Sequence, residues 1–344
     1  MLKHEDHEEL RWLAEAAICR GWAQSRRRDH SADHDEVNQT YHLMRWSTRY
    51  LAELWRPIFA RRKVAMRISG VFCHKTPLAT FEDMNARKRT CELGDLLVVH
   101  DRLGHRPQRR AALMQAKRTR KGSAVATDAV QNDLYRRFPP FSLSRKGHGS
   151  TQLKKGPRDV GNVDDFARFA LVADDAGRCF WTAHRGPGRS PLIFWPGHPN
   201  ESRPAWTVAH PKQDPITSVG SETFGSFISG MLFDTHPARG RTVLPILDLE
   251  AASLGSGLDL DITVQELLDL TARRLTRSKE KWGGLPRGIF AFQDGTLPSA
   301  NPANPFCDLM PLVEGGMEPP EGIAPEEFDD GEGISVLLIE TSGD

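Results

Sequence analysis

Residues 94–118 read GDLLVVHDRLGHRPQRRAALMQAKR and hold two apolar runs that carry polar side chains near their ends. Both runs, DLLVV and AALMQAK, are almost continuously apolar, which is typical of strands covered on both faces of a sheet. Asp95 opens the first run, and Gln115 and Lys117 stand in the second, two residues apart and therefore on one face of the strand. Polar groups at a sheet edge are costly to bury unpaired. We therefore expect Asp95, Gln115 and Lys117 to line an opening, bind one another or hold a metal ion.

The segments around these two runs predict a mixed α/β core. Apolar residues at helical spacing predict helices, and short apolar runs bounded by turn residues predict strands. In chain order the predicted elements are a helix over 41–62, strands over 64–72, 95–99 and 111–117, a helix over 124–137 and a strand over 166–174. Pro57 is expected to kink or shorten the first helix. The core, residues 41–175, thus has the order helix, strand, strand, strand, helix, strand.

The rest of the chain predicts a helical extension before the core and a mixed α/β region after it. Residues 1–40 hold a helix over 5–25 and then a polar linker, SRRRDHSADHDEVNQ. Residues 176–344 hold the strand RCFWTAH, expected to form a hairpin with 166–174, a helix that opens at a Thr263–Glu266 capping box, and a last strand, ISVLLIE. The acidic segment PPEGIAPEEFDDGEG is expected to be disordered.

Composition limits the class of protein. The chain has 344 residues, of which 39% are hydrophobic, and this is enough for a buried core. No stretch approaches the roughly 20 apolar residues that span a bilayer, and the start, MLKHEDHEEL, carries acids where a signal peptide is apolar. The five cysteines lack CxxC spacing and predict neither a disulfide framework nor a zinc finger. We expect a soluble, cytoplasmic protein with no membrane partner.

The net charge of +1 conceals a strong asymmetry along the chain. Between Arg102 and Arg158 there are 15 Lys or Arg residues and two acids, whereas ten acids and no Lys or Arg lie between Glu314 and Asp344. A basic run of this kind is either a solvated face or a phosphate-binding surface. Its position around the second apolar run favours nucleic-acid binding.

The motif residues resemble a known group of enzymes. Gly94-Asp95, followed about twenty residues later by Gln115-Ala116-Lys117-Arg118 and set within the predicted element order, is similar to the PD-(D/E)XK restriction-endonuclease-like superfamily. The likeness is to its Mrr-type branch, in which glutamine replaces the acid of the E-x-K triplet. The resemblance implies an α/β fold with a restriction-endonuclease-like core, αβββαβ around a mixed central sheet, over residues 41–175.

The resemblance also implies roles for the site residues. Asp95 would bind Mg²⁺ or Mn²⁺, Gln115 would be the second ligand through its amide oxygen, and Lys117 would orient or activate the attacking water and stabilise the phosphate. The family often adds a glutamate from the first core helix. Glu53 is the candidate for this metal ligand and catalytic residue, and Glu92, three residues before Asp95, is the alternative. Magnesium prefers such oxygen ligands and activates bound water.

Basic residues near the triplet are expected to bind the nucleic-acid backbone: Arg118, Arg120, Lys121, Arg136 and Arg137. Such contacts give affinity rather than sequence specificity. The resemblance implies the function of a magnesium-dependent endonuclease that hydrolyses DNA phosphodiester bonds, as the effector of a bacterial antiviral defence or restriction system. The expected partners are DNA, a protein of that system and a second copy of the chain.

Two alternatives stay open at this point. RNA is an alternative substrate, because nothing in the sequence reads a 2′-hydroxyl. Since Gln115 carries no charge, the domain is alternatively a catalytically degenerate nuclease-fold module that binds nucleic acid or a partner protein.

Overall fold

The structure is a computed structural model of the 344-residue chain. It describes residues 2–28, 36–73, 77–104, 107–120, 123–124, 128–144, 156–173, 181–184, 193–196, 204–213, 216–218, 221–233, 239–245, 257–277, 281–282, 285–286, 289–294, 297, 304–306 and 333–343. The predicted disordered segment lies almost entirely outside these residues.

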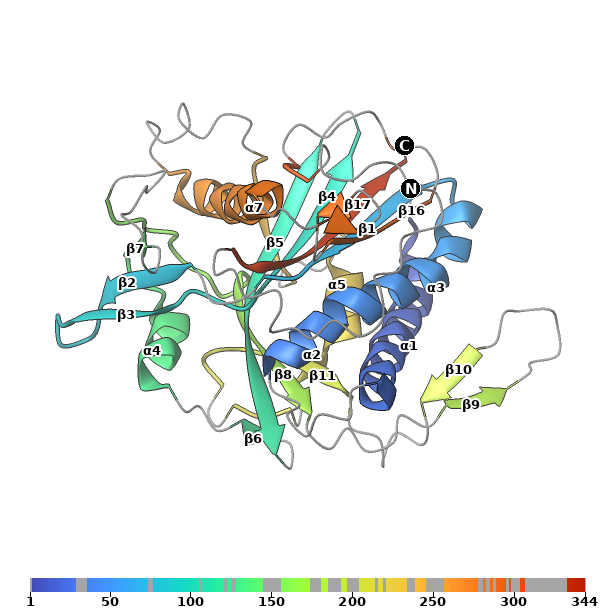
Figure 1. The fold of residues 1–344 in the computed structure, drawn as a ribbon, viewed down its shortest axis with the longest axis horizontal. Coiled ribbons are helices and arrows are strands. Elements are labelled where there is room, and N and C mark those ends of the chain that lie inside the picture. The colour runs from blue at the N-terminus through green and yellow to red at the C-terminus, as the bar shows by residue number, and fades with distance from the viewer. Residues whose placement is uncertain are drawn as a thin grey trace.

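A ten-stranded mixed sheet runs through the centre of the described residues (Figure 1). Its strands, in the order in which they lie side by side, are β12 (Glu222–Thr223), β11 (Trp206–Ala209), β8 (Ala167–Ala173), β5 (Gln108–Arg120), β4 (Leu96–Leu103), β17 (Ser335–Ser342), β1 (Ala65–Val71) and β16 (Ile289–Asp294). Two further strands, β6 (Ser123–Ala124) and β13 (Arg241–Val243), pair with β5. The predicted mixed α/β class with a mixed central sheet is confirmed.

The two strands of the quoted stretch are neighbours in this sheet. β4 is antiparallel to β5, and β5 is parallel to β8. Parallel strands need a crossover connection, which includes helix α4 (Ala129–Arg137). β17 lies between β4 and β1, parallel to the first and antiparallel to the second. A strand from the C-terminal region therefore lies in the middle of the sheet. Strands from both sides of the predicted boundary after residue 175 belong to this one sheet.

Helices cover both faces of the sheet and give three layers (Figure 1). One face packs against α1 (His4–Arg28), the π-helical segment η1 (Leu43–Ser47), α3 (Thr48–Arg61) and α5 (Phe224–Gly230). The other packs against α4, α7 (Asp259–Arg277) and a small sheet of β3 (Lys88–Glu92), β2 (Leu78–Glu82) and β7 (Phe141–Ser144). Because both faces are covered, the central strands are apolar on both sides.

The predicted helix over 41–62 begins earlier than expected and contains the π-helical segment η1. α2 (Glu36–His42) leads into η1, and α3 then continues to Arg61 with Pro57 inside it, so Pro57 does not end the helix. The π-helical segment packs tightly on β1, because a Cβ at Gly70 would lie 2.5 Å from the carbonyl oxygen of Met44. α2 also begins within the stretch predicted to be a linker.

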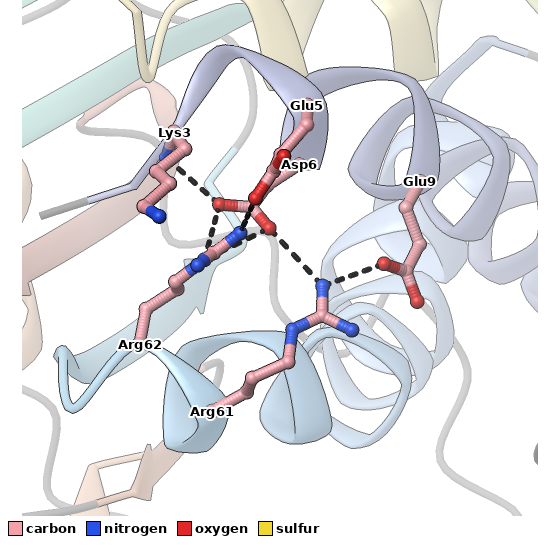
Figure 2. Close-up of polar contacts among 6 residues, drawn as sticks. All are labelled: Lys3, Glu5, Asp6, Glu9, Arg61 and Arg62. Carbon is pink, nitrogen blue, oxygen red and sulfur yellow. Dashed lines mark hydrogen bonds and ion pairs between the residues drawn. The ribbon is translucent and has the colours of Figure 1, made fainter.

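An ion-pair cluster fixes the start of α1 to the end of α3 (Figure 2). Asp6 is buried, and its carboxylate accepts hydrogen bonds from Arg61 at 3.1 Å, Arg62 at 2.8 Å and the backbone N–H of Lys3 at 2.7 Å. Arg61 also pairs with Glu9 at 2.7 Å. Burial alone would raise the pKa of Asp6, but these hydrogen bonds outweigh it and leave the pKa below its ordinary value.

Two local predictions are wrong. β9 (Trp181–His184) pairs with β10 (Ile193–Pro196) in a separate two-stranded sheet, so it does not form a hairpin with β8. α7 begins at Asp259, before the expected cap at Thr263, and Glu266 forms a buried ion pair with Arg158. A further two-stranded pair joins β14 (Lys281–Trp282) to β15 (Leu285–Pro286). None of the helices in the described part of the chain has both the length and the apolarity that a membrane crossing requires.

Candidate functional site

Asp95, Gln115 and Lys117 line a single cavity of about 240 Å³. The cavity lies where β4 begins and where β5 continues past its pairing with β4, next to the first residues of α2 and α4. The remaining lining residues are Glu36, Val37, Thr40, Phe72, Cys73, Glu92, Asp128, Gln131 and Ser335. The structure therefore brings together the three polar residues that the strand pattern selected.

The pairing of β4 with β5 sets Asp95 against Gln115. The backbone N–H of Asp95 donates to the carbonyl oxygen of Met114 at 2.9 Å. Because side chains alternate along a strand, Asp95 shares a face with Leu97, and Gln115 shares a face with Leu113. Both leucines belong to the core that packs against α4 and α7. The two polar side chains thus meet on the face that α4 covers.

A chain of hydrogen bonds joins Asp95 to α4. Oδ2 of Asp95 accepts from the backbone N–H of Ala116 at 2.8 Å and from Nε2 of Gln115. Oε1 of Gln115 accepts in turn from Nε2 of Gln131, in the first turn of α4. Asp128 caps this helix, because its side chain accepts hydrogen bonds from backbone N–H groups of the first turn. The start of α4 is thereby fixed beside the carboxylate.

Gly94 allows α4 to approach the start of β4. The hydroxyl of Tyr135 in α4 donates to the carbonyl oxygen of Leu93 at 2.8 Å, and its ring stacks on Phe169 with centroids 5.1 Å apart. A Cβ at Gly94 would lie 2.7 Å from Oη of Tyr135 and 2.9 Å from Leu113. The glycine of the Gly-Asp pair therefore has a packing role, since any side chain there would displace the helix that orients Gln115.

The surroundings of Asp95 disfavour its negative charge. Burial raises the pKa of Asp95 to about 7, and the charges of Glu92 and Glu36 add to the rise. The hydrogen bond from Ala116 and the positive charge of Lys117 oppose it. An opposite charge close to a carboxylate favours its ionised form. A cation bound in the cavity would therefore relieve this electrostatic cost.

Glu36, Glu92 and Asp128 are the other carboxylates at the cavity, and Asp128 is the residue that caps α4. Glu92 ends β3, and it is the residue predicted as the alternative to Glu53. Glu36 opens α2, and sequence reasoning missed it because it lies in the stretch taken for a linker. A signal was present, since Val37, Tyr41 and Met44 follow at helical spacing.

The structure does not bring Glu53 to the cavity. Its Oε1 accepts a hydrogen bond from Nε of Arg49 at 2.8 Å, one turn earlier on α3, and its side chain is 39% exposed. α3 packs on the sheet through Trp55 and Ile58, on the face opposite to α4. The position predicted for Glu53 is thus corrected, and Glu36 and Glu92 are the glutamates that lie at the cavity.

The cavity residues satisfy part of what a magnesium site needs. Within the described ranges, no three His, Cys, Asp or Glu side chains lie close enough together to hold one metal ion. Magnesium keeps several waters and needs only one or two protein carboxylates, and the carboxylates of Asp95, Glu36 and Glu92 line the same cavity. Gln115 turns its amide nitrogen toward Asp95 and its oxygen toward Gln131. The side-chain amide of Gln115 must therefore flip before Oε1 can bind a metal ion beside Asp95.

The predicted phosphate-binding residues have different surroundings. Arg118 is exposed on β5, close to the cavity. The side chain of Arg120 and all of Lys121 lie outside the described residues. On α4, Arg136 is partly exposed, and the exposed Arg137 pairs with an aspartate one turn earlier.

Other arginines of the basic run lie inside the protein. Arg109 is buried and donates to both carboxylate oxygens of Asp101 at 2.7 Å, and to Oε1 of Gln265 at 2.7 Å. Arg158 is buried against Glu266 of α7. These residues stabilise the packing of α7 on the sheet, so the basic surface is smaller than the charge count suggests.

No protein-family model, no curated protein and no solved structure matches the chain.

Proposed function

We propose that the protein is a metal-dependent nuclease that hydrolyses DNA phosphodiester bonds at the cavity of Asp95, Gln115 and Lys117. The observation that carries the proposal is that these three side chains, from two neighbouring strands, line one opening. Metal-dependent hydrolysis of a phosphodiester uses a metal ligand, an oriented water and a positive charge near the phosphate. A carboxylate, an amide and an amine at one point can supply these needs.

The strand arrangement supports a restriction-endonuclease-like core. β4 and β5 are antiparallel neighbours, α4 follows, and β8 returns parallel to β5. This is the strand, strand, helix, strand part of the αβββαβ order. β1 precedes these elements, and β17 lies between it and β4. In this proposal β17 is an addition to the core, inserted between its first and second strands.

Each residue at the cavity has a separate task in the proposed site. Asp95 would hold Mg²⁺ or Mn²⁺ together with Glu36 or Glu92, and such an ion neutralises phosphate charge and lowers the pKa of bound water. Gln131 contacts the Gln115 amide from α4 and so sets which way that amide faces.

Lys117 would act on the phosphate itself. It is partly exposed and lines the cavity, so its ammonium group has access to a substrate. A positively charged donor stabilises the negative charge that develops on phosphate oxygens in the transition state. Arg118, exposed on the same strand, would add backbone affinity.

A binding-only module is the second candidate, and one observation favours it. Oδ2 of Asp95 already accepts hydrogen bonds from the Gln115 side chain and the Ala116 backbone. If these hydrogen bonds persist when nucleic acid binds, Oδ2 of Asp95 stays engaged with the protein and is not available to a metal ion. The protein would then bind DNA without cutting it.

Cleavage of a supercoiled plasmid with Mg²⁺ or Mn²⁺ separates the two functions. We expect wild type to cut, and Asp95→Asn and Lys117→Ala each to lose at least about 100-fold in rate. Lys63→Ala is the control, because Lys63 is exposed at the end of α3, on the other side of the sheet. Binding without cleavage in wild type favours the binding-only module, and undiminished cleavage in both site variants would refute the proposed nuclease site.

A further inference from the structure

The β2–β3 hairpin projects from the body of the molecule beside α4 (Figure 1). β3 ends at Glu92, which lines the cavity, and its first residue, Lys88, pairs in register with Glu82 of β2. Because side chains alternate along a strand, Lys88, Thr90 and Glu92 share one face. The face that borders the cavity therefore continues along the hairpin toward its turn.

The opposite face of the hairpin is buried, and this fixes its orientation. Ala79, Phe81 and Cys91 belong to the core that includes residues of α4. On the outer face Thr90 is exposed, and its hydroxyl lies 3.0 Å from that of Thr80 across the hairpin. The outer face is thus a polar surface held in place by the core beneath it.

The turn of the hairpin is also well ordered by its own hydrogen bonds. Oδ1 of Asp83 accepts from the backbone N–H groups of Asn85 and Arg87 at 2.8 and 2.9 Å. Oδ2 of Asp83 pairs with Arg89 at 2.9 Å. Met84 at the tip is 78% exposed, the most of any large hydrophobic side chain in the described residues. The turn therefore presents one apolar side chain on a fixed support.

Two cations beside this turn have no acidic partner. Within the described part of the chain, neither Arg87 nor Lys88 forms an ion pair, whereas the charge of Arg89 is balanced by Asp83. Glu82 lies opposite Lys88 in register and lowers the local positive charge. Both unpaired cations are exposed, close to the face that leads to the cavity. Lys and Arg in such positions contact nucleic-acid phosphates.

We propose that the β2–β3 hairpin is an arm that binds double-stranded DNA on one side of the cleavage site. Arg87 and Lys88 contact backbone phosphates, and Met84 contacts the groove edge. A strand advances about 3.3 Å per residue, so these contacts lie about 13 to 20 Å from Glu92, or roughly four to six base pairs along a duplex. This inference rests on the proposed nuclease function, which sets where the duplex enters.

The salt dependence of duplex binding, measured in EDTA so that no metal-dependent cleavage occurs, tests the arm. Arg87→Ala combined with Lys88→Ala should reduce the slope of log K against log salt by about 1.8, which is about 60-fold in affinity at about 0.1 M salt. Met84→Ala should weaken binding without changing this slope, because its contact is apolar. Glu82→Gln should strengthen binding, because it removes the acid that faces Lys88.

Lys63→Ala is the matched control and should bind like wild type. Unfolding midpoints should be equal for all variants, since the substituted side chains are exposed. If wild type binds duplex and the Arg87/Lys88 variant keeps the same affinity and slope, the arm is refuted. If wild type cleaves DNA but its binding does not depend on Arg87 and Lys88, the proposed arm alone is refuted. If binding depends on Arg87 and Lys88 but wild type does not cleave, the proposed nuclease function alone is refuted. Absence of duplex binding by wild type refutes both.

Discussion

Oε1 of Glu36 accepts a hydrogen bond from the backbone N–H of Arg118 at 2.8 Å, which fixes a carboxylate from α2 beside the strand that carries Gln115 and Lys117. The charge of Glu36 also helps to raise the pKa of Asp95. Two carboxylates from different elements therefore influence each other at one cavity. This relationship makes Glu36 the first residue to test after the three that the strand pattern selected.

Glu36→Gln is expected to slow magnesium-dependent cleavage by about 10- to 100-fold, the range typical of residues that support a metal site. Gln keeps an acceptor for the Arg118 amide and removes the charge. The measurement is the single-turnover cleavage rate at several Mg²⁺ concentrations. Glu53→Gln is the matched control, since it is the same change at a helix position that pairs with Arg49 away from the cavity. Equal losses in the two variants would contradict the assignment of Glu36.

Gly94→Ala is expected to destabilise the protein by about 1–3 kcal/mol, the usual cost of overpacking. The new methyl would lie 2.7 Å from Oη of Tyr135 and 3.1 Å from the carbonyl oxygen of Met114. Urea unfolding measures the loss. Tyr135→Phe removes the nearest atom, so the two changes should be less than additive in a double-mutant cycle. Strictly additive losses would show that the helix is not held by this contact.

The buried carboxyl group of Glu15 should make the free energy of unfolding fall as the pH rises. It accepts a hydrogen bond from the backbone N–H of Ser226 at 3.1 Å, at the start of α5. Burial raises the pKa of Glu15 from 4.5 to about 7. The native state therefore binds more protons than the unfolded chain between these pH values, and stability falls as the pH rises through this window. Glu15→Gln should be more stable than wild type above pH 7, by up to about 3 kcal/mol, and similar to it near pH 4.5.

The ion-paired carboxylate of Asp6 should give the opposite dependence of stability on pH, and it serves as the control for Glu15. Its pKa lies below the ordinary value of 3.8, so its contribution is present above that pH and is lost as the pH falls through the native pKa. Asp6→Asn should lower the thermal midpoint near neutral pH and matter less in acid. If both variants shift stability in the same direction at every pH, the pKa directions given for these two residues are wrong.

The α/β class and the site strands could be predicted because their signals are local. The runs around Leu97 and Leu113 are apolar on both faces, and the alternation that follows from strand geometry placed Gln115 and Lys117 on one side. The position of β17 could not be predicted, since it depends on pairing between distant segments, such as the buried contact of Arg67 with Glu340. The β2–β3 hairpin was also missed, because most of its residues are polar and its few apolar residues form no continuous run.

The candidate site was predictable only where it follows strand geometry. Glu53 was chosen from the periodicity of one helix, but that helix covers the face of the sheet opposite to α4. Glu36 reaches the cavity because the helical segment of η1 and α3 begins earlier, at α2, and the helical spacing of Val37, Tyr41 and Met44 was the local signal for this start. The sequence also does not show which charged side chains are buried. Arg109 belongs to the basic run of the sequence, but the structure buries it in an ion pair with Asp101.

The central claim is that Asp95 holds a divalent cation with which this cavity cleaves DNA. Its most direct test is the single-turnover rate of duplex cleavage against Mn²⁺ concentration, in wild type and in Asp95→Asn. We predict a saturable rise for wild type, no cleavage in EDTA, and at least about a 100-fold lower rate in the variant. Cleavage that persists in EDTA, or that has the same metal dependence in Asp95→Asn as in wild type, would contradict it.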